Sequence, residues 1–223
     1  MMFGVIPAFW QRRVTGGGGL VVIYEGGHNV PGVVGGLALT KRNEFAARLT
    51  TFTTFDFSDV TLGAAVNGLS RVRNTITIQL ATSQTAPTPT VNFDESNGRF
   101  NTSPETTRPP SNNYFIENLE ISDTIPFIIN FTPAVPAFAF FATDIGDFGG
   151  QVQLRVTKSD TSTVTYTMEI EASTANGNCY FWGIVDTSGT TYTKVEFFSD
   201  TPGTEDFYGI DDIIAVPASY IIP

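Results

Sequence analysis

From residue 50 onward the chain alternates between apolar and polar residues over many short stretches, a pattern that predicts β-strands. In residues 74–80, Ile76, Ile78 and Leu80 share one face, and the residues between them are threonine or glutamine. Residues 151–158 alternate in the same way. Successive side chains of a strand point to opposite faces, so each of these strands is expected to have one buried side.

Further strand-like stretches follow one another between glycine, proline and asparagine turns. They cover residues 114–121, 126–131, 137–142, 163–171, 179–185, 192–198 and 207–216. Many inward positions in these stretches are aromatic, so the expected core is rich in phenylalanine. Strands of this length joined by such turns predict an all-β protein, an antiparallel β-sandwich of two sheets.

Residues 37–50 contain the one helix that the sequence predicts. Thr40 is placed to cap its start. Glu44 precedes Arg48 by four residues, which is the spacing of a favourable helical ion pair. We expect this helix to be a minor element beside the strands.

The first 36 residues differ from the rest because glycine is concentrated there, with four in a row at 16–19. Glycine is costly to order and has no side chain to fill a core, so we predict a glycine-rich N-terminal arm. One interpretation is a loose terminus with a single edge strand. The other is an assembly arm that becomes ordered against a partner subunit by burying Phe3, Phe9 and Trp10.

Composition agrees with a β-rich globular protein. Apolar residues make up 41% of the 223 residues, which is enough for a core, and only 15% are charged. Residues 1–73 carry 7 basic and 4 acidic side chains, whereas residues 74–223 carry 5 basic and 18 acidic ones. An acidic body argues against nucleic-acid binding and fits a bound cation, a neutral ligand or solubility alone.

Two residue types that occur once limit the chemistry further. Cys179 has no second cysteine to pair with and precedes three aromatic residues, so we expect a buried, inert thiol. His28 lies in a glycine-rich segment, which does not suit the fixed geometry of a Ser-His-Asp triad. We also expect no membrane insertion, because no apolar run is long enough, and no signal peptide, because Arg12 and Arg13 follow the apolar residues 3–10.

Acidic residues in a glycine-rich loop form the candidate metal site. The sequence Ala-Thr-Asp-Ile-Gly-Asp-Phe-Gly-Gly at 142–150 follows an apolar run and places Asp144 and Asp147 in a tight turn. Calcium takes about six to eight oxygen ligands and accepts irregular loops. These two carboxylates, with Asp211 as a further ligand, therefore predict calcium as the cofactor. The alternative is that the aspartates cap turns by accepting backbone hydrogen bonds.

Aromatic residues offer a candidate ligand-binding platform. Tyr114, Trp182 and Tyr208 could stack on the C–H faces of a sugar, because an amphipathic ring can lie half exposed. The alternative is that these rings belong to the core, since their neighbours are also apolar. A glycosidase would need two matched carboxylates, and nothing in the sequence selects such a pair, so we predict no catalytic residues.

Six short motifs occur in order at 99–104, 112–114, 138–150, 175–178, 181–183 and 208–212. They include Arg-Phe-Asn-Thr-Ser-Pro, the aspartate loop, Ala-Asn-Gly-Asn, Phe-Trp-Gly and Tyr-Gly-Ile-Asp-Asp. Their order and spacing resemble the extracellular β-sandwich domain of bacterial PEP-CTERM-type secreted proteins, over about residues 90–217. The resemblance implies a jelly-roll-like sandwich of the carbohydrate-binding-module kind and exposure at a surface, and it does not imply a particular chemistry.

The chain ends without the sorting segment of that family, and this favours a bacteriophage virion component. We expect a non-catalytic virion surface protein, either a tail-fibre or adhesin-like subunit or a capsid decoration subunit. Residues 1–80 would form the arm and assembly region, and residues 90–217 the jelly-roll-like sandwich. The expected partners are other virion proteins, further copies of the chain, as in a trimer, and a cell-surface glycan. The alternatives are an extracellular bacterial carbohydrate-binding module and a polysaccharide-acting enzyme.

Overall fold

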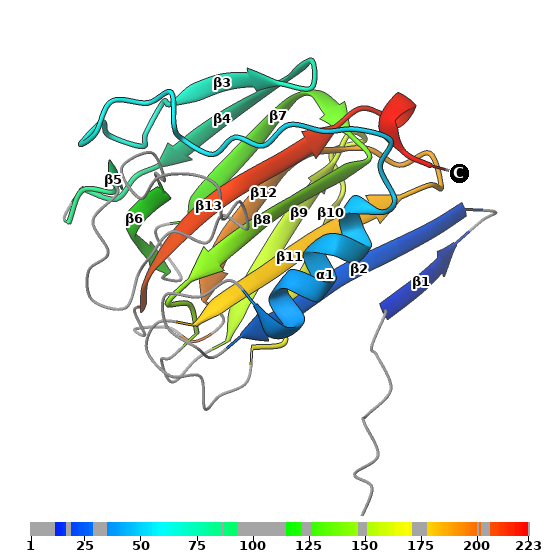
Figure 1. Ribbon diagram of the computed structural model, residues 1–223, viewed down its shortest axis with the longest axis horizontal. Helices are drawn as coiled ribbons and strands as arrows, with labels where there is room; N and C mark the ends of the chain where they lie inside the picture. Colours follow the sequence, from blue (N-terminus) through cyan, green and yellow to red (C-terminus); the bar gives the residue numbers. More distant parts are fainter. Residues whose placement is uncertain are drawn as a thin grey trace, which may run out of the picture.

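The structure of the chain is a computed structural model. It describes residues 12–16, 19–28, 35–85, 87–92, 115–121, 126–146, 151–170, 178–199, 201 and 206–222. The strands of these residues form two antiparallel sheets that pack face to face (Figure 1). The predicted all-β sandwich is therefore confirmed.

The first sheet has seven strands and the second has six. The order of the first sheet is β1 (Arg12–Gly16), β2 (Gly19–His28), β11 (Cys179–Asp186), β8 (Ala137–Thr143), β13 (Asp206–Val216), β6 (Phe115–Ile121) and β5 (Thr90–Asn92). The order of the second sheet is β10 (Thr163–Thr167), β9 (Val152–Lys158), β12 (Tyr192–Ser199), β7 (Phe127–Val135), β4 (Ile76–Thr82) and β3 (Ser70–Arg73).

Strands from the beginning of the chain belong to the same sandwich as the later strands. In the seven-stranded sheet β2 pairs with β11 along eight residues, and Val22, Ile23 and Tyr24 of β2 are buried in their own chain. In the six-stranded sheet β4 pairs with β7. Residues 19–28 of the predicted N-terminal region therefore form a strand of the seven-stranded sheet, between β1 and β11, and the division into residues 1–80 and 90–217 stays a prediction.

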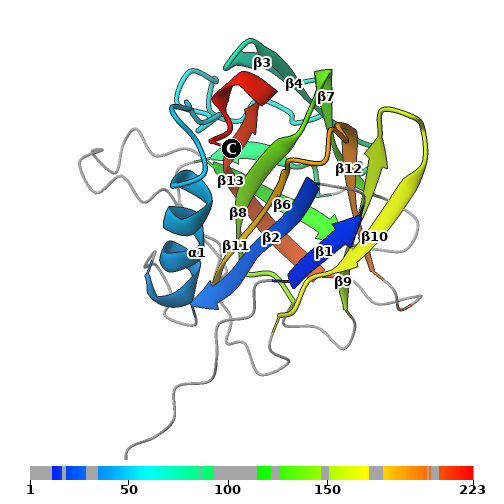
Figure 2. The ribbon, with the colours of Figure 1, turned by 90° about the vertical axis from the view of Figure 1, so that its right-hand side faces the viewer.

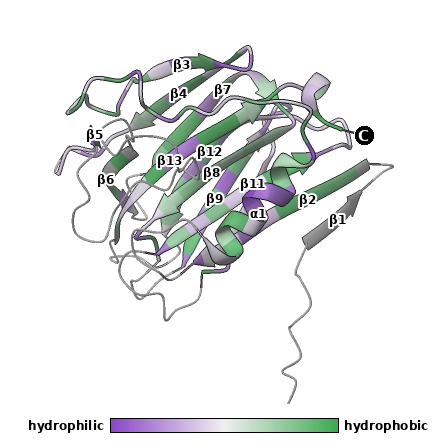
Figure 3. Cartoon of the chain, in the orientation of Figure 1, coloured by the Kyte–Doolittle hydropathy of each residue, from purple (hydrophilic) through white to green (hydrophobic). Residues whose placement is uncertain are grey.

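The main core fills the space between the two sheets. The side chains of Ile76, Ile78 and Leu80 are fully buried there, as the alternation predicts. Strand β8 is buried along its whole length, and nearly every residue in it is apolar (Figure 3). Such a strand has one face in the main core and the other face beneath a further layer.

That further layer consists of α1 (Gly36–Ala46), which covers the outer face of the seven-stranded sheet over β2 and β11 (Figure 2). Phe45 of α1 is fully buried, and its ring meets Tyr24 and Phe181 edge-on at centroid distances of 5.9 Å and 5.8 Å. Gly183 permits this contact, because a Cβ atom there would lie 3.0 Å from the Phe45 ring.

The predicted helix is present, but its end and its polar contacts differ from the prediction. It ends at Ala46, and Gly35 rather than Thr40 occupies the cap position. Thr40 lies inside the helix, where its hydroxyl donates to the Gly36 carbonyl. The ion pair of the described helix joins Lys41 to Glu44 at 2.8 Å. No helix in the described part of the chain is long and apolar enough to cross a membrane.

A connecting segment, residues 47–69, runs from α1 to β3 and inserts aromatic side chains into the main core. Phe55 and Phe57 are fully buried, and the Phe55 amide donates to the Ile213 carbonyl at 2.7 Å. The C-terminal turn η2 (Ala218–Tyr220) holds the start of this segment, because the Thr50 amide donates to the Tyr220 carbonyl. The segment is therefore part of the sandwich rather than a free loop.

Candidate functional site

The two sheets differ in what covers their outer faces. On the seven-stranded sheet, α1 and Phe52 of residues 47–69 lie over a second apolar cluster. On the six-stranded sheet, the described residues include no helix that packs against the outer face, and Gln79, Arg155 and Thr165 are exposed there. We call this surface the open face.

The open face consists of polar side chains that alternate with buried residues along four neighbouring strands and the edge strand β10. Its members are Gln79 on β4, Asn130 on β7, Lys194, Phe198 and the largely buried Glu196 on β12, Gln153 and Arg155 on β9, and Thr163 and Thr165 on β10. Sequence reasoning missed this surface, because each residue is an ordinary surface residue when it is considered alone. The alternation of polar and apolar residues did contain this information, because it places the polar residues of each strand on the face that points away from the core.

Register brings the open-face residues into two rows across the sheet. Asn130 lies opposite Gln79 on one neighbouring strand and opposite Lys194 on the other. In the next row Glu196 lies opposite Arg155. Neighbouring strands are about 4.8 Å apart, so these polar groups lie within about 15 Å of one another.

Contacts within the open face restrain its charged groups. The Lys194 ammonium lies 3.0 Å from the Glu196 carboxylate. The Arg155 guanidinium lies over the Phe198 ring, 4.6 Å from the centroid. Amide and guanidinium groups are planar hydrogen-bonding groups, and with a partly exposed ring they suit a polar, uncharged ligand such as a sugar.

The aromatic residues singled out in the sequence do not form this surface. Trp182 and Tyr208 are fully buried in the main core, so neither ring offers a face to a sugar. Trp182 points between the sheets because Tyr180, Trp182 and Ile184 alternate along β11 with residues that face α1. The core alternative therefore describes these two rings, and Tyr114 lies outside the described residues.

Two members of the predicted calcium site, Asp144 and Asp211, lie in the described part of the chain. Asp211 on β13 lies opposite Phe141 of β8, whereas Asp144 comes three residues later, beyond the end of β8. Both side chains are buried, and Asp144 has a positive φ of 55°. The described residues contain no group of three acidic, histidine or cysteine side chains placed to hold a metal. Asp147 lies outside the described residues, so calcium binding stays a prediction.

A calcium titration tests that prediction directly. If calcium binds at Asp144 with a dissociation constant about 100-fold below the added concentration, it stabilises the fold by about 2.7 kcal/mol. For a chain of this size the melting temperature then rises by roughly 5–10 °C. Differential scanning fluorimetry with calcium and with a chelator measures the shift. The increase should be absent in Asp144→Asn and present in Asp160→Asn, which alters an exposed turn carboxylate. An unchanged melting temperature contradicts the site.

Two further carboxylates, one buried and one partly buried, accept hydrogen bonds from tyrosine hydroxyls. Asp186 is 2% exposed, and it accepts the Tyr192 hydroxyl at 2.7 Å and the Ser188 amide at 2.7 Å. Glu25 accepts the Tyr180 hydroxyl at 3.1 Å. The pKa of each tyrosine is raised well above its ordinary value. Burial of the hydroxyl is the largest cause, and the neighbouring carboxylate is the next. Each pair joins two strands of the sandwich.

Cys179 agrees with the sequence prediction of an inert thiol. It is fully buried, and burial together with the charge of Asp211 raises the pKa of the thiol well above its ordinary value. A thiol without thiolate character is a poor nucleophile and a poor metal ligand. The predicted assembly residues Phe3, Phe9 and Trp10 lie outside the described residues.

Comparison with known proteins adds no family. No protein-family model matches the chain, and no curated protein matches it. The resemblance to PEP-CTERM-type domains therefore rests on the motif residues alone.

Proposed function

We propose that this protein is a non-catalytic surface protein of a bacteriophage virion that presents the open face to a ligand. A tail-fibre or adhesin-like subunit fits this role, and a capsid decoration subunit is the related alternative. The observation that carries the proposal is the unequal covering of the two sheets. One outer face is sealed by apolar packing against α1, while the other presents restrained polar groups and the partly exposed Phe198 ring.

Three further observations support a binding role over a catalytic one. The main core is filled by aromatic side chains, such as Trp182 between Phe138 and Phe140. The buried Asp186 and the partly buried Glu25 each accept a hydrogen bond from a tyrosine hydroxyl. The open face combines amides, both charges and a ring, which is the chemistry that recognises a cell-surface glycan.

Phage adsorption tests the proposal. Particles that carry the double variant Asn130→Ala/Arg155→Ala should contain a normal amount of the protein but should adsorb poorly to host cells. Removing two polar contacts of about 1–1.5 kcal/mol each predicts roughly a 30- to 150-fold loss of affinity per site. Val72→Ala, which alters an exposed residue on β3, is the matched control and should adsorb normally.

Two results would overturn parts of the proposal in different ways. If mass spectrometry of purified particles does not detect the wild-type protein, it is not a virion protein. Normal adsorption of the double variant would instead contradict the binding role of the open face. The second candidate function, a bacterial extracellular carbohydrate-binding module, is favoured by the same polar face. It predicts glycan binding by the free protein, lost in the double variant, together with absence from particles.

A further inference from the structure

Each sheet ends in two edge strands, which are β1 and β5 in the seven-stranded sheet and β3 and β10 in the six-stranded sheet. Backbone groups on the outer side of an edge strand can template pairing with another chain, so proteins usually cover or cap them. The described residues contain such caps at β3 and at β5.

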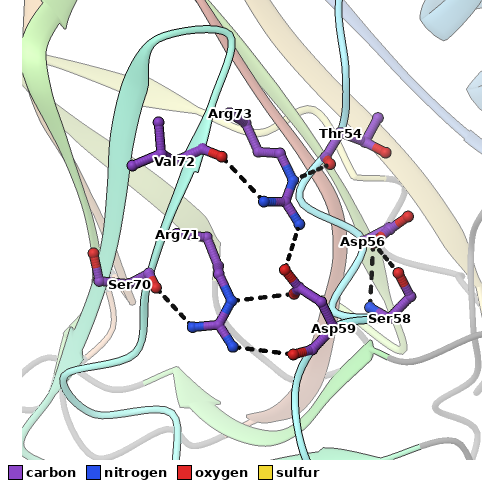
Figure 4. A network of polar contacts seen from close by, with 8 residues as sticks. All are labelled: Thr54, Asp56, Ser58, Asp59, Ser70, Arg71, Val72 and Arg73. Carbon is purple, nitrogen blue, oxygen red and sulfur yellow. Dashed lines mark hydrogen bonds and ion pairs between the residues drawn. The ribbon is translucent and has the colours of Figure 1, made fainter.

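Two arginines cap the outer side of β3 (Figure 4). Nη1 of Arg71 donates to the Ser70 carbonyl at 2.8 Å, and Nη1 of Arg73 donates to the Val72 carbonyl at 3.0 Å. The Asp59 carboxylate holds both guanidinium groups, at 3.2 Å from Nε of Arg71 and 2.9 Å from Nη2 of Arg73. A strand from another molecule would have to displace this network.

Main chain covers the outer side of β5. The Val91 amide donates to the Ala64 carbonyl at 3.1 Å, and the Gly63 amide donates to the Val91 carbonyl at 2.8 Å. Ala65 forms an isolated bridge with Thr90. The side of the sandwich that contains β3 and β5 is therefore closed to strand addition.

Strand β1 has no such cover in the described part of the chain. It pairs with β2 along all five of its residues, and no described strand lies on its other side. Figure 1 shows β1 at the margin of the seven-stranded sheet, beyond α1. Residues 1–11, which include the predicted assembly residues, directly precede β1 in the sequence.

Hydrogen bonds of β2 show which backbone groups of β1 point outward. The Leu20 amide donates to Oγ1 of Thr187 at 3.0 Å, and the Thr187 amide donates to the Leu20 carbonyl at 2.9 Å. The backbone amide and carbonyl of Leu20 therefore point away from Thr15, the residue opposite Leu20 on β1. In an antiparallel ladder the backbone amide and carbonyl of Thr15 then also point away from Leu20, toward the outer side of β1. The backbone groups of Arg13 also point outward, because Arg13 is two residues earlier on the same strand.

We propose that β1 pairs antiparallel with β1 of a second copy of this chain, about a twofold axis at Val14. Arg13 of one copy then lies opposite Thr15 of the other, and the outward groups of both residues form four backbone hydrogen bonds. The two seven-stranded sheets become one continuous sheet. This dimer deepens the assembly part of the proposed function and rests on it only for its biological setting.

Charge and chain direction favour this register. Arg12 lies opposite Gly16 of the other copy, so no two arginines face each other, and directly opposed like charges would be unfavourable. A register centred on Arg13 would oppose two arginines. Antiparallel pairing also places Arg12, where β1 begins, beside Gly16 of the other copy, and the predicted assembly residues Phe3, Phe9 and Trp10 directly precede this point in the sequence.

Proline substitutions on the open edges test the pairing in solution. Thr15→Pro removes an outward amide of β1 but leaves the β1–β2 hydrogen bonds in place, because proline is tolerated at such edge positions. We expect multi-angle light scattering to show twice the 24.1-kDa chain mass for the wild type and the single mass for Thr15→Pro. Thr15→Ala, which keeps the amide, should remain a dimer. Circular dichroism should be the same for all three proteins.

A matched proline on the other open edge tests the choice of strand. The Met168 amide donates to the Val152 carbonyl, so the backbone groups of Met168 point toward β9. Backbone direction alternates along a strand, and the amide of Thr165, three residues earlier, therefore points outward from β10. Thr165→Pro should therefore remain a dimer. A wild-type monomer at concentrations up to about 1 mM would overturn the proposal. A trimer, or a dimer dissociated by Thr165→Pro and not by Thr15→Pro, would overturn it as well.

A cysteine at the twofold axis tests the register independently of affinity. Opposed residues of a non-hydrogen-bonded pair have Cα atoms about 4.5 Å apart, which a disulfide can span. We expect Val14→Cys to form a disulfide-linked dimer under mild oxidation, visible on a non-reducing denaturing gel. Arg12→Cys should form little of this covalent link, because Gly16 and not Arg12 of the other copy lies opposite it. Cys179 is fully buried and does not interfere. Absence of the linked dimer in Val14→Cys would contradict the register.

Discussion

Trp182→Ala should unfold the protein or leave it with little residual stability. The indole is fully buried, with Phe138 at 5.7 Å, Phe140 at 5.9 Å and Tyr166 at 5.7 Å between ring centroids. Its removal leaves a large cavity between the sheets, and such substitutions cost about 3–5 kcal/mol. This loss is a large part of the roughly 5–15 kcal/mol that stabilises a typical domain. Urea unfolding followed by far-ultraviolet circular dichroism measures the change.

The control for this experiment is Val72→Ala on β3, where the side chain is 61% exposed. Substitution there should change the free energy of unfolding by no more than about 0.5 kcal/mol. The experiment also separates the two interpretations of Trp182. A stacking residue on the surface would lose glycan binding and keep its stability. Wild-type stability in Trp182→Ala would therefore contradict the burial described here.

Alkaline pH should destabilise the fold steeply. Burial is the main cause that raises the pKa values of Cys179, Tyr180 and Tyr192 above their ordinary values of 9.0, 10.0 and 10.0. Above pH 10 all three groups lose protons in the unfolded chain and keep them in the folded chain. The stabilisation is therefore complete below pH 9 and is lost as the pH rises. Each group contributes about 1.4 kcal/mol per pH unit, so the combined slope is about 4 kcal/mol per unit.

Free energies of unfolding from urea titrations between pH 8 and pH 11.5 would measure this slope. Tyr192→Phe is the informative variant, because it removes one of the three titrating groups. Its slope should fall by about one third, although the Asp186 carboxylate also loses a hydrogen bond and the variant is less stable at every pH. A stability that does not change between pH 10 and pH 11.5 would contradict the proposed linkage.

The sequence predicted the strands best where only one face is buried. Val152, Leu154 and Val156 are buried as their alternation requires, and their neighbours are partly or fully exposed. On such strands, polarity alone decides which side faces the core. The same rule places Gln79 and Arg155 on the open face, so the surface was available from the sequence once the two sheets were known.

Prediction failed where both faces of a strand are buried. Every residue of β11 is buried, with Tyr180 and Trp182 in the main core and Phe181 beneath α1. Apolar residues without alternation cannot show which ring faces which layer, or whether any ring is exposed. The sequence therefore left two interpretations of Trp182 and Tyr208, stacking rings at the surface or core residues, and the structure places both rings in the core.

The glycine-rich beginning shows a related limit of local composition. The glycines at 26 and 27 lie in β2 beside bulky partners. A Cβ atom at Gly27 would lie 3.2 Å from the Tyr180 ring. At these positions glycine makes room for a neighbour that is distant in the sequence, and local composition does not contain that information.

The position of β13 has a consequence for how the protein is made. It is the last of the described strands in the sequence, and it lies inside the seven-stranded sheet, paired with β8 on one side and β6 on the other. The sheet therefore has a gap until residues 206–216 have been synthesised. A nascent chain on the ribosome would expose apolar surface throughout its synthesis, and products of premature termination would be substrates for chaperones and proteases rather than smaller folded domains.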